Sequence, residues 1–450
     1  TAMVKTIEVL RDGAAAQYGS DAISGVVNVR LRTDRDGGEA TVSYGARDTE
    51  YDILTGTAPA GATWSAKNSR KRSDGETATV SIWKGLPVSD TGYLTIAAEF
   101  KDQKRTERGG YDMRQQYPLV NGTFDPREAT IDRFNAWYGE PEMTQATLFV
   151  NGGDNLGGGA KVYGWASYQN RDARSAGFFR RAVQDQNIIS IYPNGFLPII
   201  APTVDDYSAT AGVSWTVGKW DMDTSLGYGK NKMAFTIENT LNRSIGPSSK
   251  TEFEAGGFSY DQLVYNLTGV RSVDMASMAS PVNVAVGAEA RREGYKLFAG
   301  EPDSYRFGGV MLRNGLPAPP GAQVFPGFRP ANESNTHRTA IGAFVDVEAN
   351  LTKELLASIA VRGEHYSDFG DSLAGKLALR YDFSKEFALR ASAQNGFRAP
   401  SPQQQNFTTT STNFIDGVPY EITTFKPNDP VAIALGAKPL DAEKSTNISL

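Results

Sequence analysis

The chain has 450 residues, with 46 Lys and Arg against 51 Asp and Glu, and a net charge of −5. It contains no cysteine, which excludes a disulfide scaffold, a thiolate-bound zinc or iron–sulfur centre, and a cysteine nucleophile. Its two histidines argue against a metalloenzyme, and its balanced charge offers no basic surface for nucleic acid. A run of about 18 apolar residues is absent, which excludes a membrane-spanning helix, whereas a membrane β-barrel needs only one apolar face.

Residues 1–36 predict a strand, a short helix and a second strand. Residues 4–10 and 25–31 are short apolar strand candidates, and residues 14–18 form a short helix that Gly19 can cap. A unit of this size cannot bury its own apolar faces, so we expect it to lie against another part of the protein. Because Thr1 is not an initiator and no export signal follows it, we expect the chain to be an internal section of a longer protein.

From residue 39 onward, apolar and polar residues alternate with a period of two. Leu373, Leu377 and Leu379 share one parity, and Lys376 and Arg380 share the other, so each set occupies one face of a strand. Strands of about 12 residues extend for about 40 Å, enough to cross a hydrocarbon core of about 30 Å when tilted, whereas soluble strands usually have about 5–6 residues. The segments predict an all-β fold with about 14 antiparallel strands of a transmembrane barrel.

The connections between these segments alternate between short turns and long loops, as in an outer-membrane barrel. Exposed aromatic residues at strand ends, such as Tyr381 and Phe383, would belong to an interfacial ring. Short turns are expected at 86–92, 152–159, 218–219, 276–281, 352–353 and 384–385, and long loops at 58–74, 109–141, 174–203, 241–256, 298–336 and 398–441.

Two stretches carry a resemblance to a known family. Residues 7–29 (IEVLRDGAAAQYGSDAISGVVNV) resemble the end of the plug domain of TonB-dependent outer-membrane receptors. Residues 395–401 (NGFRAPS) and 443–447 (EKSTN) are similar to the barrel signature of that family, and 192–198 (YPNGFLP) is similar to loops in one of its branches. The resemblance implies that residues 1–36 end a plug domain and that 37–450 form part of a plugged barrel of about 22 strands.

The resemblance also implies a function: energy-coupled import of a scarce nutrient across the bacterial outer membrane. The cargo of this class is an iron–siderophore complex, cobalamin or a carbohydrate. The implied partners are TonB with its inner-membrane energising complex, outer-membrane lipid and the cargo, without nucleic acid and without a cofactor. Glu8 and Arg11 match plug positions that face charged barrel residues in the family. Arg362 and Glu364 belong to a charged lumen face that suits a hydrophilic plug.

Candidate site residues follow from position and chemistry. Parity from Arg390 places Arg398, beside Phe397, on the lumen face near the loop end, where it would brace the plug or contact cargo. Aromatic faces stack on sugar rings or catecholate-like groups, and arginine binds carboxylate or phosphate, although both also serve in ordinary loop packing. The candidate substrate-binding residues in the loops are Tyr111, Arg114, Tyr117, Trp137, Tyr138, Phe178, Phe179, Arg180, Arg181, Tyr192 and Phe196.

Other patterns do not indicate a catalytic or metal site. The glycines of 152–159 lack the Lys-Ser/Thr of a phosphate loop and predict a hairpin turn. Neighbouring carboxylates such as Asp205 and Asp206 could suggest glycoside hydrolysis, but 51 acidic residues make such neighbours common. We expect His337 and His365 to be separate surface residues. The rival interpretations are a soluble or surface-attached carbohydrate-binding β-protein and a hydrolase; we expect no enzyme.

Overall fold

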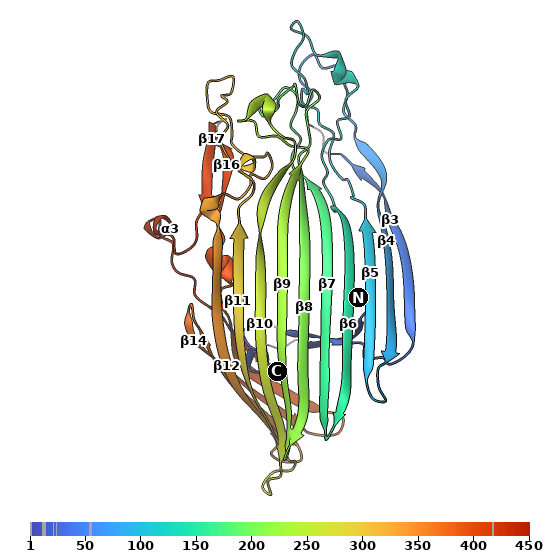
Figure 1. The fold of residues 1–450 in the computed structure, drawn as a ribbon, viewed down its shortest axis with the longest axis vertical. Helices are drawn as coiled ribbons and strands as arrows, with labels where there is room; N and C mark the ends of the chain where they lie inside the picture. Colours follow the sequence, from blue (N-terminus) through green and yellow to red (C-terminus); the bar gives the residue numbers. More distant parts are fainter. Residues whose placement is uncertain (1, 11–14, 21, 24, 54–55, 416–417) are drawn as a thin grey trace.

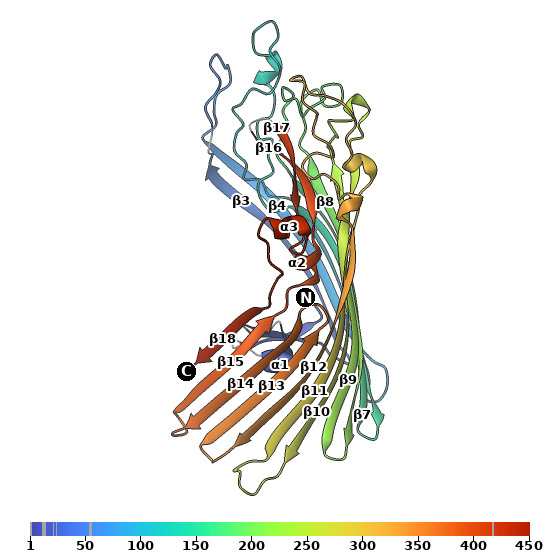
Figure 2. The same ribbon diagram turned by 90° about the vertical axis from the view of Figure 1, so that its left-hand side faces the viewer.

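The structure is a large curved antiparallel sheet that partly encloses a small N-terminal segment (Figures 1 and 2). The computed structural model describes residues 2–10, 15–20, 22–23, 25–53, 56–415 and 418–450. The sheet has 14 strands that follow chain order from β3 to β15, with β18 paired to β15 at the far edge, so the predicted strand number is confirmed. Its strands are β3 (Gly38–Asp52), β4 (Ser69–Pro87), β5 (Tyr93–Gln103), β6 (Glu142–Gly157), β7 (Ala160–Ala176), β8 (Ile199–Val217), β9 (Trp220–Glu238), β10 (Phe253–Val273), β11 (Val282–Phe298), β12 (Ser334–Asn350), β13 (Leu355–Tyr366), β14 (Gly370–Asp382), β15 (Ala388–Arg398) and β18 (Glu443–Ser449).

The N-terminal segment has the predicted strand–helix–strand order. β1 (Val4–Leu10) pairs with β2 (Val26–Leu31), and α1 (Ala15–Tyr18) lies inside the curve of the sheet, against β12 to β15 (Figure 2). Gly19 ends the helix with a φ of +92°, and its N–H donates to the backbone oxygen of Ala15 at 3.0 Å. Glycine adopts this left-handed conformation without the steric cost that a Cβ would add.

The two faces of the sheet differ in chemistry as the alternation predicts. We call the convex side the outer face and the concave side, which contacts α1, the inner face. On β14, Leu373 and Leu377 are exposed on the outer face, whereas Ala374 is fully buried on the inner face. On β13 the inner face carries Arg362 and Glu364, only 3 % and 5 % exposed. A broad exposed apolar surface is typical of contact with a membrane or another protein.

The connector between β2 and β3, residues 32–37, is tied to the sheet near its short turns. Asn151 on β6 donates to the backbone oxygen of Arg32 at 2.7 Å. Arg35 donates to two backbone oxygens of the turn after β4, at distances of 2.6 and 3.0 Å. The connector is therefore fixed to the wall by side-chain to backbone hydrogen bonds on both sides.

The prediction of a turn over residues 152–159 is wrong in part, because β6 continues to Gly157 and β7 begins at Ala160. The turn itself is therefore shorter than predicted. A Cβ on Gly153 would lie 2.9 Å from the ring of Tyr93. The glycine therefore lets an aromatic ring of the neighbouring strand pack across β6, and it does not interrupt the strand.

Some segments expected as irregular loops contain regular structure. β4 and β8 begin inside the expected loops 58–74 and 174–203. The stretch 398–441 contains a separate hairpin, β16 (Thr409–Ile415) with β17 (Val418–Thr424), between two short helices. No helix among the described residues is long and apolar enough to cross a membrane. The remaining helices are α2 (Pro402–Asn406), α3 (Pro430–Ala434) and the 3₁₀ helices Pro126–Ala129, Gly246–Ser248, Pro302–Ser304 and Pro330–Asn332.

The two faces give a direct test of lipid contact. Leu377 is 48 % exposed on the outer face, and its neighbour Ala378 faces inward. In a bilayer, Leu377→Arg should lower the unfolding free energy by about 2–4 kcal/mol near the midplane, and Ala378→Arg should cost less. Urea unfolding of the complete protein in lipid vesicles measures both. Equal losses for the two variants would contradict lipid on the outer face.

Candidate functional site

The long loops lie together at one end of the sheet (Figure 1). Two of them line a cavity of about 290 Å³. The loop between β5 and β6 (residues 104–141) and the loop between β7 and β8 (residues 177–198) supply its walls. The structure therefore brings together two loops that are separate in sequence. Six of the predicted substrate-binding residues line this cavity: Tyr111, Arg114, Tyr138, Phe178, Phe179 and Arg180.

A buried ion pair gives loop 104–141 its own core. Arg133 Nη2 lies 2.5 Å from Glu128 Oε2, and both side chains are 1 % exposed. Glu128 Oε1 accepts hydrogen bonds from the backbone N–H groups of Gln116 at 2.7 Å and Tyr117 at 2.9 Å. The Arg133 guanidinium also lies 4.1 Å from the centre of the Trp64 ring. These contacts hold the loop in one conformation beside the cavity.

Arg114 lies at the cavity wall but is neutralised by its neighbour. Its Nε and Nη2 donate to the two carboxylate oxygens of Asp112 at 2.7 and 2.8 Å. Burial by itself raises the pKa of Asp112, but hydrogen bonds from Arg114, Gln116 and Asn135 outweigh it and lower this pKa to about 2. Arg114 and Asp112 therefore add little net charge to the cavity.

Arg180 and Arg181 are held differently, by neutral oxygen atoms. Arg180 Nε donates to Gln323 Oε1 at 2.8 Å, and its Nη1 donates to the backbone oxygen of Phe178 at 2.8 Å. Arg181 Nη1 donates to the backbone oxygen of Gln115 at 2.6 Å, and its buried Nε has no partner among the described residues. Burial lowers the pKa of both arginines, and the nearby Arg114 lowers that of Arg181 further. The hydrogen-bond acceptors of Arg180 and Arg181 therefore leave the charges of these two arginines without a bonded carboxylate.

A second cavity of about 480 Å³ adjoins the first and shares Arg180 and Gln184 with it. Its wall also includes Arg243 and Gln323. Sequence patterns missed these last two residues, because Gln323 lies 143 positions from the arginine that it contacts. A local motif carries no signal for such a pairing.

Five predicted loop residues lie outside the lining of the first cavity, among them Arg181. Tyr117 is 3 % exposed and donates to Asn194 at 3.2 Å, whereas the rings of Tyr192 and Phe196 stack with centres 4.6 Å apart. Trp137 packs under the guanidinium of Arg105 at 3.9 Å. These residues hold the loops together, and their contact with cargo stays a prediction.

The predicted plug contacts are placed as follows. Glu8 forms an ion pair with Arg30 at 2.7 Å and accepts a hydrogen bond from Asn28 at 2.9 Å, and both of these partners lie on the paired strand β2. Arg11 lies outside the described residues. Arg398 is exposed and stands opposite Glu443 in the strand register. The roles of these residues between plug and barrel stay predictions.

Near Arg398 the side chains depart from strict alternation. Phe397 is 2 % exposed and packs against Tyr366, with ring centres 6.3 Å apart, although parity placed Arg398 on this side. Gly396 is also buried, and a Cβ on it would lie 3.3 Å from the Cβ of Ala15. Because α1 packs against this end of β15, the buried position favours the aromatic side chain of Phe397 over the charged side chain of Arg398.

Polar contacts join the N-terminal segment to the inner face. Gln17 donates a hydrogen bond to Asp346, and Tyr366 donates to the hydroxyl of Ser20 at 2.8 Å. A Cβ on Gly19 would lie 3.2 Å from a carboxylate oxygen of Glu364, so this glycine allows the close approach. Sequence reasoning missed these pairs because their members are more than 300 positions apart in the chain.

The barrel strands match a known family. Residues 149–450 match the description "TonB dependent receptor-like, beta-barrel". The chain belongs to the TonB-dependent receptor family. This membership confirms the family resemblance of the barrel stretches, and it supports the receptor over the rival carbohydrate-binding protein or hydrolase. The assignment of residues 1–36 to a plug domain stays a prediction.

Individual relatives agree with this TonB-dependent receptor assignment. The "Ferric enterobactin receptor PirA" of Pseudomonas aeruginosa strain PAO1 is 23% identical, over 99% of this chain and 52% of the relative. The siderophore receptor PirA from Acinetobacter baumannii has the same fold, with a TM-score of 0.60, 14% identity, and coverage of 99% of this chain and 54% of that one. The RagAB peptide transporter gives a TM-score of 0.59 at 10% identity, covering 99% and 56%. The chain spans about half the length of these proteins.

The ion pair in the core of loop 104–141 can be tested in this TonB-dependent receptor by replacing one partner. Glu128→Gln leaves the buried Arg133 without its counter-charge, which should destabilise the loop by about 3–5 kcal/mol. Amide hydrogen exchange across the loop measures the change. Glu140→Gln is the control, because Glu140 and its partner Arg47 are 48% and 56% exposed and their pair contributes about 0–1 kcal/mol. Equal effects would contradict the assigned role.

The Asp112 carboxylate predicts a pH dependence. Folding lowers its pKa from 3.8 to about 2, so the ionised form stabilises the folded loop. This contribution is complete above the unfolded pKa and disappears as the pH falls through the folded value. Unfolding free energies of the wild type and Asp112→Asn should therefore converge as the pH drops from about 5 to about 2. A gap that stays constant over this range would contradict the pairing.

Proposed function

We propose that the complete protein is a bacterial outer-membrane receptor that imports an anionic, aromatic iron–siderophore complex. The single observation that carries the cargo class is Arg180 at the wall of the loop-end cavity, where its hydrogen-bond acceptors among the described residues are the neutral oxygens of Gln323 and Phe178. The name of the Pseudomonas aeruginosa relative, a ferric enterobactin receptor, supports the same class.

Catecholate-like groups match the cavity in two respects. Their oxygens are anionic and can accept charge-assisted hydrogen bonds from Arg180, which are stronger than bonds between neutral groups. Their rings can stack on Phe178 and Tyr138, which line the cavity and are 69% and 53% exposed. A neutral sugar could use the aromatic faces, but it offers no counter-charge to the arginines.

The transport step uses the N-terminal segment. In this proposal residues 1–36 end the plug domain and residues 37–450 belong to the barrel, with lipid on the outer face. Hydrogen bonds such as Tyr366 to Ser20, and the close fit at Gly19, hold the plug against the inner face. TonB, energised by the inner-membrane complex, would pull on the plug and break these contacts so that the cargo passes inward.

The charge of Arg180 is the feature to test. Arg180→Gln in the complete receptor should weaken binding of ferric enterobactin about tenfold or more, the loss expected for a hydrogen bond to a charged group. Arg47→Gln is the matched control, because Arg47 is an exposed loop-end arginine already paired with Glu140 at 2.6 Å. Quenching of intrinsic fluorescence by the ferric complex gives both affinities.

Uptake of radiolabelled iron in cells with and without TonB tests the transport half of the proposal. We expect uptake that requires TonB and that falls in the Arg180→Gln variant. Wild-type affinity in Arg180→Gln would contradict the proposed cargo site, and preferential binding of cobalamin or an oligosaccharide would contradict the cargo class. Uptake that is independent of TonB would contradict the mechanism.

A further inference from the structure

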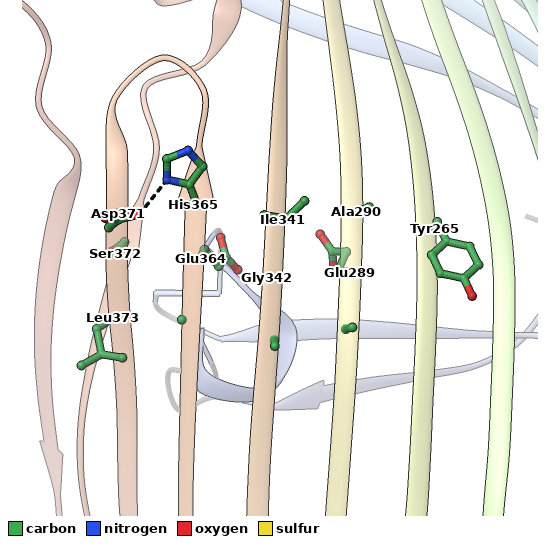
Figure 3. A pocket seen from close by; sticks show the side chains of 13 residues that line it. Tyr265, Glu289, Ala290, Ile341, Gly342, Glu364, His365, Asp371, Ser372 and Leu373 are labelled. Carbon is green, nitrogen blue, oxygen red and sulfur yellow. Dashed lines mark hydrogen bonds and ion pairs between the residues drawn. The ribbon is translucent and has the colours of Figure 1, made fainter.

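Titratable side chains at two cavities of this molecule are paired with each other. A groove of about 830 Å³ crosses β10 to β14 on the outer face, and there His365 Nδ1 lies 2.7 Å from Asp371 Oδ1 (Figure 3). In the first loop cavity, Arg114 is bound to a neighbouring carboxylate. Arg180 differs from these residues, because one of its acceptors is the side-chain amide of Gln323 and the other is a backbone oxygen.

Gln323 joins its own loop, between β11 and β12, to two other loops. Its Oε1 accepts a hydrogen bond from Arg180 Nε at 2.8 Å, and its Nε2 donates to the backbone oxygen of Gln186 at 2.5 Å. Its backbone N–H donates to the hydroxyl of Thr240 at 3.0 Å, and this hydroxyl donates in turn to the backbone oxygen of Gln323 at 3.0 Å. Thr240 is fully buried between β9 and β10. Both the side chain and the backbone of Gln323 are therefore fixed.

The two side-chain partners of Gln323 require an amide. The guanidinium of Arg180 can only donate hydrogen bonds, and the backbone oxygen of Gln186 can only accept them. An amide supplies an acceptor to the first and a donor to the second, whereas a carboxylate would place a second acceptor against the backbone oxygen. The hydrogen bonds therefore select a neutral side chain at position 323, and Arg180, which stays protonated, keeps its full charge.

The backbone next to Gln323 is strained. Val324 has a φ of +76°, in the left-handed region that a β-branched residue rarely adopts. Gly177 makes room for it, because a Cβ on this glycine would overlap Cγ2 of Val324. On the other side of Gln323, Ala322 is buried and its N–H donates to the backbone oxygen of Ser304 at 2.9 Å. Strain of this kind persists only where the surrounding contacts fix the chain, and it is common where ligands bind.

The bonds to Arg180 leave part of its guanidinium available. Its Nε and Nη1 donate to Gln323 and Phe178, and its Nη2 donates to none of the described residues. Arg180 lines both loop cavities, and no Asp or Glu is among the described residues that line the second one. An anion in either cavity therefore meets a guanidinium that is fixed in position and carries an uncompensated charge.

We propose that Gln323 is a positioning residue that sets the preference of the loop cavities for anionic cargo. It orients Arg180 through a neutral acceptor, so the guanidinium is held in place while its charge stays available to the cargo. This role rests on the proposed function, in which Arg180 binds the cargo. It adds that the selectivity for charge depends on a residue 143 positions away in the sequence, which acts through Arg180.

The test is the affinity of the complete receptor for ferric enterobactin at low and high salt, measured by fluorescence quenching. Gln323→Glu keeps nearly the same size but gives Arg180 a carboxylate partner, which neutralises its charge. Gln323→Leu is the matched control, because it removes both side-chain hydrogen bonds of Gln323 without adding a charge. Amide hydrogen exchange in loop 177–198 reports how far each variant loosens the loop, since both lose the bond to Gln186.

We expect Gln323→Glu to weaken binding about tenfold or more, as Arg180→Gln does, and Gln323→Leu to weaken it only about threefold. Hydrogen exchange in loop 177–198 should rise similarly in the two variants at position 323. High salt should weaken binding less in Gln323→Glu than in the wild type or Gln323→Leu, because salt screens an uncompensated charge.

A purely structural role for Gln323 predicts a different result. Equal losses of affinity in Gln323→Glu and Gln323→Leu, wild-type affinity in Gln323→Glu, or a wild-type salt dependence in Gln323→Glu would each overturn the inference. The proposed function would stand in these cases as long as Arg180→Gln weakens binding. Wild-type affinity in Arg180→Gln would overturn the proposed cargo site and this inference with it.

Discussion

The backbone hydrogen-bond register of the antiparallel sheet is the constraint on which the rest of the molecule depends. Each strand between the two edges of the sheet forms backbone hydrogen bonds with both of its neighbours. Side chains that are opposite in register share a face of the sheet. A slip of one residue in one strand would move Leu377 inward and Lys376 outward. The apolar outer face, the charged inner face and the place of the loops at one end are all consequences of this single register.

Sequence patterns predicted the sheet because the period of two is repeated in long segments, and they predicted α1 because Gly19 permits the conformation that ends it. They failed where a residue's role depends on a distant neighbour. The sequence predicts Gly153 in a turn, because the packing of Tyr93 against this glycine is visible only in the folded sheet. Local alternation in β15 likewise did not predict that Phe397 is buried near Ala15, because the contact with α1 has no signal in the sequence of β15.

The loop cavity shows which features of a candidate binding site can be predicted from residue type alone. Arginine and aromatic residues pointed to two loops that the structure brings together, and six of these residues line one cavity. Residue type could not separate Arg114, which is neutralised by Asp112, from Arg180, which bonds to Gln323. That distinction decides the charge of the cavity, and it arises from the folding of three loops onto one another. The same limit applies to Tyr192 and Phe196, whose stacking is a property of the folded loop.

The connector of residues 32–37 has a mechanical consequence. Because Asn151 and Arg35 attach it to the wall at the short-turn end, it is the fixed point between the N-terminal segment and the sheet. Tension applied upstream, at β1, would load these bonds before it reached β3. These bonds therefore separate the mechanical load on β1 and β2 from the edge strand β3.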